Sequence, residues 1–331
     1  MPPPARDRFT LISFPAEKRL ARFAHDVRAG LTASPKWLSC CYFYDHLGSR
    51  LFEAICELPE YYLTRAETAI LLAHAEEIAG FFPGPTDLIE LGSGSAVKTR
   101  LLIEAFLQRP QALRYVPLDI CRTVLEEAAR DLLPVFPELE IMAIAAEYHE
   151  GLQHLQTVTG RRKLVLWLGS NIGNLERAEA AQFLDRVRAT LTAEDRVLVG
   201  IDLRKDAAVL EAAYDDSCGV TAAFNRNLLA RINQELGGQF DLRSFRHRAV
   251  YNEQAGRVEM YLVSACAQKV KIEQLSLEVG FKEGEPIHTE NSYKYSQAEI
   301  ETLAAGSGLH LEQAWLDPEQ RFQLNLFRPA S

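Results

Sequence analysis

Short apolar runs alternate with longer amphipathic stretches through residues 65–202. In the longer stretches, Leu and Ala recur at spacings of three and four residues, which is the period of a helix with one buried face. The short runs are mainly apolar, as expected for strands of a parallel sheet that helices cover on both faces. They lie at residues 88–91, 115–118, 141–144, 164–168 and 196–201. The pattern predicts an α/β fold with five alternations of strand and helix.

The C-terminal part of the chain departs from this alternation. Residues 309–315 and 322–327 are strand-like runs joined by a proline-containing turn, which predicts a β-hairpin that rejoins the sheet. Residues 203–295 have no place in that sheet, because a helical stretch is followed there by several strand-like runs. They predict a second, α+β domain.

Residues 203–295 of the second domain are expected to begin with a helical stretch. That stretch spans residues 207–236, and the strand-like runs after it lie at residues 248–252, 257–264 and 270–279. We therefore expect a first domain of residues 66–202 and 296–331 and a second domain of residues 1–65 and 203–295.

Composition narrows the class of protein. A length of 331 residues fits about two domains of roughly 150 residues each. The net charge of −9, without any basic block, argues against a nucleic-acid surface. No segment approaches the roughly 18 apolar residues of a membrane span, and the first residues lack the apolar stretch of a signal peptide. We expect a cytoplasmic protein without membrane contact, and its acidic surface favours a monomer.

Cysteine and histidine spacing gives no sign of a metal. The six cysteines are scattered and include no Cys-x-x-Cys pair, so we expect reduced thiols. The eight histidines include no His-Glu-x-x-His motif. No metal site is predicted.

A two-glycine loop, Glu90-x-Gly92-x-Gly94, follows the first predicted strand and precedes a helix. Glycine lets the backbone turn sharply and approach a ligand, and a helix start offers unpaired N–H groups. Asp119 ends the next strand, 25 positions after Gly94, where an acid can hold ribose hydroxyls. A nucleotide-like cofactor is expected here, although a glycine-rich turn without a ligand would show the same pattern. A dinucleotide fingerprint would need a third glycine where the chain has Val97, which disfavours a nicotinamide enzyme.

Six segments carry further motifs. They are Tyr44-Asp45-x-x-Gly48-Ser49-x-Leu51-Phe52, Leu58-Pro59-Glu60-Tyr61-Tyr62-x-Thr64-Arg65, Glu90-Leu91-Gly92-Ser93-Gly94-Ser95-x-x-Lys98-Thr99, Leu168-Gly169-Ser170-x-Ile172-Gly173-Asn174, the run from Ala213-Tyr214-Asp215-Asp216 to Phe224-Asn225-Arg226-Asn227, and Glu290-Asn291-Ser292-Tyr293-Lys294. In this order they resemble the histidine-specific Nα-methyltransferases that act first in ergothioneine biosynthesis.

The resemblance extends over nearly the whole chain and implies both a fold and a reaction. The fold is a class I, Rossmann-like methyltransferase core that ends in a β-hairpin, with a second α+β domain that binds the substrate. The reaction is trimethylation of the α-amino group of L-histidine to hercynine, with S-adenosylmethionine as the methyl donor.

The family's cofactor contacts match Gly92, Lys98 and Asp119 of this chain. Glu147 and Tyr148 match the pair that flanks the adenine, where the family is expected to carry Asp-Phe. Glu-Tyr preserves one carboxylate and one ring at those positions.

The family's amino-acid contacts match Tyr61, Asn174 and Tyr214, with Gly169 nearby. An amide and phenols suit a zwitterion, because they can donate to its carboxylate and accept from its amine. Asn174 could instead be a turn or N-cap residue before the helix that starts near Glu176.

Recognition of the imidazole ring is implied for Glu290 and Ser292, with Met260 packed beside it. An acid that faces a ring N–H discriminates strongly, because an apolar ring would leave it buried and unpaired. Glu290 and Met260 together favour histidine over tryptophan. Tyr44 matches a tyrosine near the reacting nitrogen, which makes it the candidate for guiding the proton out.

Each of these residues also has an ordinary interpretation. Tyr61 could be plain aromatic core, Glu290 a solvated loop acid and Met260 a packing residue. At the level of function, the alternatives are an α-N-methyltransferase for tryptophan or another aromatic amino acid, and a catalytically silent S-adenosylmethionine-binding subunit.

Overall fold

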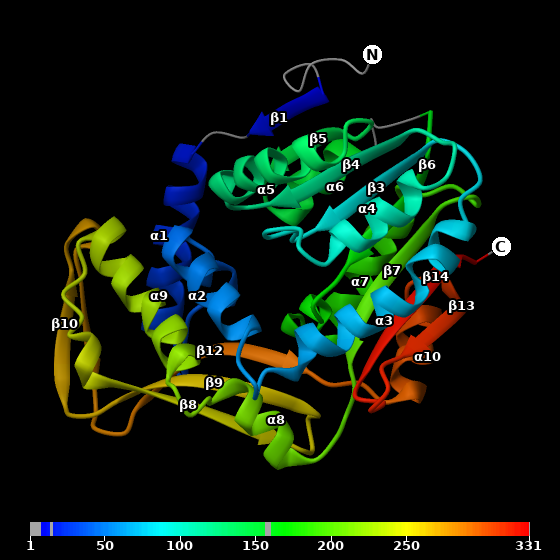
Figure 1. Ribbon diagram of the computed structural model, residues 1–331. Coiled ribbons are helices and arrows are strands. Elements are labelled where there is room, and N and C mark those ends of the chain that lie inside the picture. Colours follow the sequence, from blue (N-terminus) through cyan, green and yellow to red (C-terminus); the bar gives the residue numbers. More distant parts are fainter. Residues whose placement is uncertain (1–7, 14–15, 156–159, 331) are drawn as a thin grey trace. The chain divides into compact units, whose positions relative to one another are not determined.

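The computed structural model describes residues 8–13, 16–155 and 160–330. They form two compact units, each of which is assembled from segments far apart in the sequence (Figure 1). The first unit contains residues 8–13, 63–155, 160–204 and 293–330, and the second contains residues 16–62 and 205–292.

An eight-stranded sheet forms the first unit, in the order β1-β5-β4-β3-β6-β7-β14-β13. The strands from β1 to β7 in this order pair in parallel, whereas β14 pairs antiparallel with both β7 and β13. Their bounds are β1 Phe9–Ser13, β3 Thr86–Leu91, β4 Leu113–Asp119, β5 Glu140–Ala145, β6 Arg162–Trp167, β7 Arg196–Asp202, β13 Leu309–Leu316 and β14 Phe322–Pro329. The predicted α/β fold, its parallel sheet and its C-terminal hairpin are confirmed.

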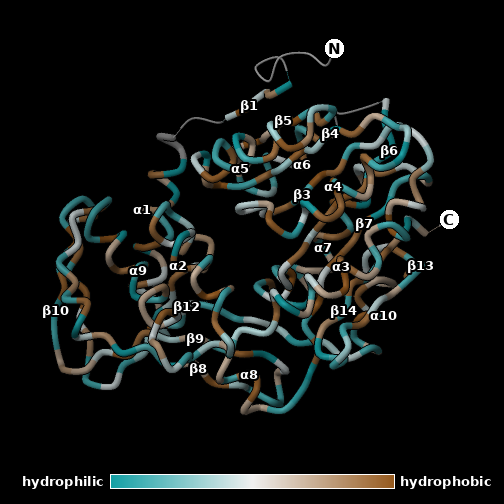
Figure 2. Tube along the Cα trace, viewed as in Figure 1, coloured by the Kyte–Doolittle hydropathy of each residue, from teal (hydrophilic) through white to brown (hydrophobic). Residues whose placement is uncertain are grey.

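Helices cover both faces of this sheet, as the continuous apolar strands require. On one face, Leu152, Phe183 and Ile300 from three helices pack in one buried cluster with Trp167 and Val199 of the strands. These helices are α6 Tyr148–Leu155, α7 Arg177–Arg188 and α10 Gln297–Gly306. The opposite face carries α3 Tyr62–Gly80, α4 Thr99–Leu107 and α5 Arg122–Val135 (Figure 1). Figure 2 shows hydrophobic colouring along the central strand β7, in which six of the seven residues are buried.

The second unit combines helices with a four-stranded sheet of order β2-β12-β9-β8 and a separate β10-β11 hairpin. Its helices are α1 Ala16–Thr32, η2 Cys40–Phe43, α2 His46–Cys56, α8 Ala207–Tyr214, α9 Val220–Leu236, η4 Leu242–Ser244 and η5 Glu273–Leu275. Its strands are β2 Lys36–Trp37, β8 Phe245–Asn252, β9 Arg257–Ser264, β10 Gln268–Ile272, β11 Leu277–Phe281 and β12 Pro286–Tyr293, whose last residue belongs to the first unit.

Two predicted elements of this unit were wrong in detail. The long helix at residues 207–236 is two helices, because the Asp216 carboxylate accepts hydrogen bonds from the N–H groups of Val220 and Thr221 and so starts α9 anew. The single run at residues 270–279 is a hairpin, because Ser276 adopts a left-handed conformation (φ 46°) that turns the chain between β10 and β11.

Residues 9–13 also differ from expectation, since they were assigned to the second domain. They form β1 at the edge of the large sheet, with Phe9 opposite Ile141 and Ser13 opposite Ala145 of β5. Backbone pairing determines the position of this strand. The sequence did not predict it, because its short, partly exposed run lacks the mainly apolar character of the central strands.

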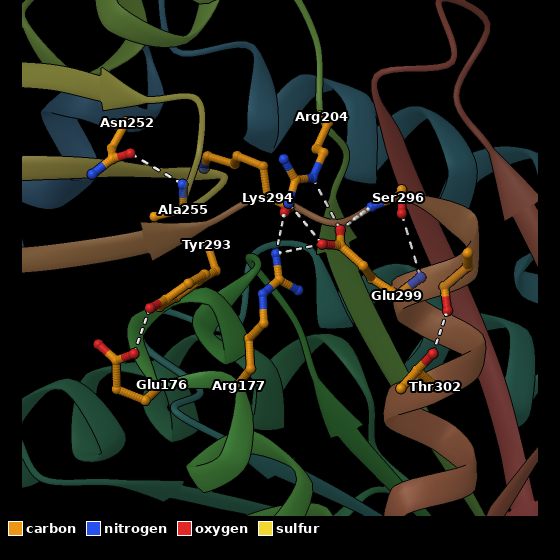
Figure 3. Close-up of polar contacts among 11 residues, drawn as sticks. Glu176, Arg177, Arg204, Asn252, Ala255, Tyr293, Lys294, Ser296, Glu299 and Thr302 are labelled. Atoms are coloured by element: carbon orange, nitrogen blue, oxygen red, sulfur yellow. Dashed lines mark hydrogen bonds and ion pairs between the residues drawn. The ribbon is translucent and has the colours of Figure 1, made fainter.

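A network of polar contacts fixes the chain where it returns to the first unit (Figure 3). The Tyr293 hydroxyl donates to the carboxylate of Glu176, and Arg177 donates to the backbone oxygen of Lys294 at 3.2 Å. The ammonium of Lys294 lies 2.8 Å from the carboxylate of Asp202, and both side chains are fully buried. A buried cation of this kind must be paired, so the segment has one preferred position in the first unit.

Glu299 is the centre of the same network (Figure 3). It accepts hydrogen bonds from Arg204 at 2.6 and 3.0 Å, lies 2.9 Å from Arg177, and completes a capping box with Ser296 at the start of α10. Partial burial acts to raise the pKa of Glu299, but the Arg204 hydrogen bond, the Ser296 N–H and the two guanidinium charges lower it to about 2.

Candidate active site

The glycine loop lies at the carboxyl end of β3, where parallel α/β sheets bind ligands. The N–H of Gly92 donates to Leu118 O at 2.8 Å, and the N–H of Gly94 donates to Asp119 Oδ2 at 2.9 Å. Both glycines have positive φ angles, 72° and 51°, which side chains with a Cβ rarely adopt. The loop is thus tied to the end of the neighbouring strand β4.

Space beside Gly92 is tight. A Cβ at this position would lie 2.7 Å from the Tyr148 hydroxyl oxygen and 3.2 Å from Asn171 Nδ2. A glycine is therefore needed both for the backbone angle and for the close approach of these two side chains. The same Asn171 nitrogen would lie 3.9 Å from a Cβ at Gly169, so three loops at the ends of β3, β5 and β6 converge here.

Lys98 precedes α4 and forms an ion pair with the carboxylate of Glu67, from α3. The Glu67 side chain is fully buried, and its two oxygens also accept from the N–H of Gly169 at 2.9 and 3.0 Å. The structure therefore brings Lys98 and Gly169, two predicted site residues, to one carboxylate.

Glu90, the acid of the glycine motif, faces the protein interior. Its carboxylate accepts from the Thr99 hydroxyl at 2.7 Å and from the Tyr115 hydroxyl. Burial raises the pKa of Glu90 to about 7, although these hydrogen bonds and the charge of Lys98 oppose the rise. With both oxygens engaged, this residue anchors the loop from behind.

Asp119 ends β4 and accepts hydrogen bonds from the N–H groups of Gly94 and Cys121, both at 2.9 Å. Burial raises the pKa of its carboxyl above the ordinary value, and these backbone donors only partly offset the rise. The residue is fixed at the position where an acid can meet ribose hydroxyls.

Glu147 and Tyr148 follow β5, and Tyr148 begins α6. The Tyr148 ring packs against Trp167 and Phe183, with ring centres 6.3 and 5.3 Å apart. Packing of this kind fixes the ring, so that its hydroxyl lies over Gly92.

The loop after β6 contains two consecutive left-handed residues, Gly169 (φ 71°) and Ser170 (φ 57°). Ser170 is buried, and its hydroxyl accepts from the N–H of Asp202 at 3.0 Å, which ties the loop to the end of β7. Asn174 is the last residue of the short helix η3 Asn171–Asn174. The alternative role of Asn174 as an N-cap is wrong, because Glu176 caps α7 with a capping box.

These residues fit a nucleoside with a charged tail. The chain offers a left-handed glycine loop that a Cβ would obstruct, a carboxylate at the end of the second strand, and a buried ion pair that presents Lys98. The donor set suits S-adenosylmethionine, which carries ribose hydroxyls and a carboxylate.

The second unit gathers aromatic rings around its predicted site residues. Tyr44 makes edge contacts with Phe52 and Phe224, with ring centres 5.6 and 5.7 Å apart. Tyr61 contacts Phe52 at 6.1 Å and Tyr214 at 6.2 Å. The three predicted tyrosines therefore belong to one continuous aromatic cluster.

Polar groups border this cluster. The hydroxyls of Tyr214 and Ser292 are 2.7 Å apart. Burial raises the pKa of Tyr61 well above its ordinary value, and the nearby Tyr214, Tyr44 and Glu290 add to this rise. Ser292 stands two residues after Glu290 on β12, so the Tyr214 hydroxyl meets the strand that carries Glu290.

Glu290 and Met260 lie on adjacent strands, β12 and β9, and both are buried, with 8% and 2% of their surface exposed. The strands are joined near Met260, whose backbone oxygen accepts from the Thr289 hydroxyl at 3.1 Å. The interpretation of Glu290 as a solvated loop acid is wrong.

The predicted residues fall into both units. Gly169 and Asn174 belong to the first unit with Gly92, Lys98, Asp119, Glu147 and Tyr148, whereas Tyr44, Tyr61, Tyr214, Met260, Glu290 and Ser292 belong to the second. Their roles in binding remain predictions.

Sequence reasoning assigned no role to Glu67, Asn171, Phe52 or Phe224. Glu67 is a single acid on a helix, 31 positions before Lys98, and gives no local signal. Phe52 and Phe224 stand inside the quoted motifs, and a count of aromatic residues near Tyr44 could have drawn attention to Phe52 alone.

Other expectations concern metals, thiols and membranes. All six cysteines are free. Within the described ranges, no group of three or more His, Cys, Asp or Glu side chains is placed to hold a metal ion. No helix in the part of the chain that the structure describes is long and apolar enough to cross a bilayer.

Comparison with known proteins identifies the family. The sequence model of the family described as histidine-specific methyltransferase, SAM-dependent, matches residues 23–329. The chain is 43% identical over 311 residues to the histidine N-alpha-methyltransferase of Mycolicibacterium smegmatis, covering 94% of this chain and 96% of that protein. It is 42% identical over 301 residues to the protein of the same name from Mycobacterium tuberculosis, covering 91% and 93%.

A longer fungal protein is also similar. The ergothioneine biosynthesis protein 1 of Neurospora crassa is 33% identical over 287 residues, which cover 85% of this chain and 32% of that protein. The family match extends over far more than half of the sequence and includes every predicted site residue. The chain therefore belongs to the family of histidine-specific, SAM-dependent methyltransferases.

Proposed function

We propose that this enzyme transfers three methyl groups in succession from S-adenosylmethionine to the α-nitrogen of L-histidine and releases hercynine for ergothioneine biosynthesis. The observation that carries the choice of histidine is Glu290. This acid is buried on β12, beside the strand of Met260 and two residues before Ser292, whose hydroxyl meets Tyr214. A buried carboxylate gains from an imidazole N–H, and a hydrocarbon ring offers it no such donor.

The methyl donor is assigned to the first unit. Gly92 would admit its close approach, Asp119 would accept from ribose hydroxyls and Lys98 would pair with its carboxylate. We place the adenine beside Tyr148, with Glu147 as its polar neighbour. The sulfonium supplies an activated methyl group, so the protein's task is chiefly to align nitrogen, methyl carbon and sulfur.

The α-amino group of the substrate must be deprotonated before it can accept a methyl group. At each step the N–C bond forms from the nitrogen lone pair as the S–C bond breaks, and the sulfonium becomes a neutral thioether. An ammonium has no lone pair, so one proton must leave the nitrogen before each transfer. Tyr44 is our candidate for orienting the amine and passing that proton outward, while Tyr61 and Tyr214 hold the zwitterion.

Mass spectrometry of the products tests this function. The purified protein is incubated with S-adenosylmethionine and, in separate reactions, with L-histidine or L-tryptophan. Three methyl groups on histidine, with little product from tryptophan, is the expected result. Preferential methylation of tryptophan would support the alternative aromatic substrate, and no product from either would favour the silent subunit.

The setting of the reaction is part of the proposal. Six free cysteines suit a reducing compartment, so we place the enzyme in the cytoplasm. The net charge of −9 favours a monomer. Light scattering coupled to gel filtration should give a mass near 37.2 kDa. A mass twice as large would contradict the monomer.

A further inference from the structure

Glu67 is a buried acid outside every motif, yet it contacts two predicted site residues. Its carboxylate forms an ion pair with Lys98 and accepts the N–H of Gly169 through both oxygens, at 2.9 and 3.0 Å. Its side chain is fully buried, whereas that of Lys98 is 22% exposed. The carboxylate therefore lies behind the ammonium, on its protein side.

The sheet leaves space for this carboxylate. A Cβ at Gly200, within strand β7, would lie 2.0 Å from Glu67 Oε1. Gly200 has no unusual backbone angle that would explain a glycine in a buried strand. The close approach of Glu67, with the Phe322 ring 3.1 Å from the same Cβ, does explain it. Four segments, from α3, β7 and the loops after β3 and β6, thus converge on the Glu67 carboxylate.

We propose that Glu67 is a positioning residue, which holds the Lys98 ammonium and the Gly169 N–H in the arrangement that S-adenosylmethionine requires. The inference rests on the proposed function, because it takes Lys98 as the group that meets the cofactor carboxylate. A long lysine side chain loses much freedom when it binds an anion. A fixed counter-ion behind the ammonium removes that freedom before the ligand arrives.

A purely structural ion pair is the competing explanation, and the first unit supplies a matched example. Asp87 of β3 is also fully buried and accepts from Arg114 at 2.9 and 2.7 Å. It lies near the amino end of β3, whereas the glycine loop lies at the carboxyl end. Asp87→Asn should therefore lower the midpoint of unfolding without changing cofactor affinity.

A double-mutant cycle on cofactor binding tests the proposal. The dissociation constant of S-adenosylmethionine is measured by calorimetry for the intact enzyme, Glu67→Gln, Lys98→Met and the double variant. We expect each single change to raise it about tenfold, as loss of a charge-assisted contact does. The double variant should lose clearly less affinity than the product of the two single losses, because Glu67 acts partly through Lys98 and partly through Gly169.

Other results would overturn the proposal. Additive losses in the double variant, or a Glu67→Gln enzyme that binds like the parent, would remove the positioning role. So would an equal loss of affinity in Asp87→Asn, since the effect would then be general destabilisation. If Glu67→Gln does not fold, Glu67→Asp retains the charge on a shorter side chain and should still weaken binding several-fold, and parental affinity in that variant would refute the role. A parent enzyme that does not bind S-adenosylmethionine at all would instead refute the proposed function.

Discussion

The two units hold their predicted site residues by different physical means. In the first unit, backbone groups and buried charges fix the site: two left-handed glycines, hydrogen bonds to strand ends, and the carboxylates of Glu67 and Glu90. In the second unit, aromatic packing connects Tyr44, Tyr61 and Tyr214, and only a few polar groups border the rings.

This difference suits the two roles that we propose. If backbone donors and paired charges bind the methyl donor, changes at Gly92, Lys98 or Asp119 should alter affinity for it. If the phenols around Glu290 bind the side chain of the amino acid, changes in the second unit should alter which amino acid reacts.

The largest effect is expected from Gly92→Ala. The new Cβ would meet the Tyr148 hydroxyl at 2.7 Å and would force a left-handed angle on alanine. We expect affinity for S-adenosylmethionine to fall by about 100-fold or more, as steric conflict and backbone strain of about 1–3 kcal/mol add together. Gly94→Ala is the matched control, because its φ is also positive but nothing lies within 4 Å of the added Cβ. Equal losses in the two variants, measured by calorimetry, would contradict the role of close approach.

Glu290→Ala should break the specificity of the second unit. Loss of the buried acid removes the acceptor for an imidazole N–H, so kcat/KM for histidine should fall by about 100-fold, the scale of one buried charged hydrogen bond. The value for tryptophan should change far less. Steady-state assays with both amino acids check this, and S-adenosylmethionine affinity serves as the internal control. Equal losses for the two substrates would argue against Glu290 as the residue that reads the ring.

Much of the first unit could be predicted from the sequence. Mainly apolar strands and a glycine loop are local patterns, and β3 to β7 and the hairpin lie where those patterns placed them. The partnership of Glu67 with Lys98 could not be predicted, because a tertiary contact between residues 31 positions apart leaves no periodic signal. The edge strand β1 was missed for a similar reason, since backbone pairing rather than an apolar run places it.

The second unit was harder to predict. Its aromatic cluster draws on α2, α8 and α9 and on the residues just after η2 and just before α3, and no spacing in the sequence connects Tyr44 with Phe224. Only the resemblance to the family singled out Tyr61, Tyr214 and Glu290. A site built from packed side chains of many segments can be recognised only in the folded structure. A site built from backbone groups can be recognised in the sequence, from its glycine motif.

Tyr44→Phe separates the packing role of the Tyr44 ring from the chemical role of its hydroxyl. The ring contacts with Phe52 and Phe224 need no hydroxyl, so packing should survive. If the hydroxyl guides the amine proton, kcat should fall about 10- to 100-fold with little change in histidine KM. Tyr42→Phe is a suitable control, because its hydroxyl donates to Asp26 at 2.6 Å. Unchanged turnover at all three methylation steps, followed by mass spectrometry, would eliminate the role of Tyr44.

The smallest effect concerns charge that stabilises the first unit away from the glycine loop. The Glu299 carboxylate is braced by Arg177 and Arg204, and its folded pKa of about 2 lies below the unfolded value (Figure 3). A lowered pKa means that the unfolded state binds the proton more readily. The stabilisation is therefore complete above about pH 4.5 and is lost as the pH falls towards 2.

Glu299→Gln should lower the free energy of unfolding by about 1–2 kcal/mol at pH 7, because solvent screens part of the interaction with the two arginines. The decline of stability below pH 4.5 should also become less steep. Denaturant titrations at several pH values measure both quantities. Glu278→Gln provides the control, because its ion pair with Lys269 is exposed and should leave stability unchanged. If Glu299→Gln lost stability equally at pH 7 and pH 2.5, its charge would not be the cause. Glu90 shows the opposite trend, since burial raises its pKa to about 7. A negative charge therefore stabilises the fold at Glu299 but is disfavoured at Glu90, behind the glycine loop.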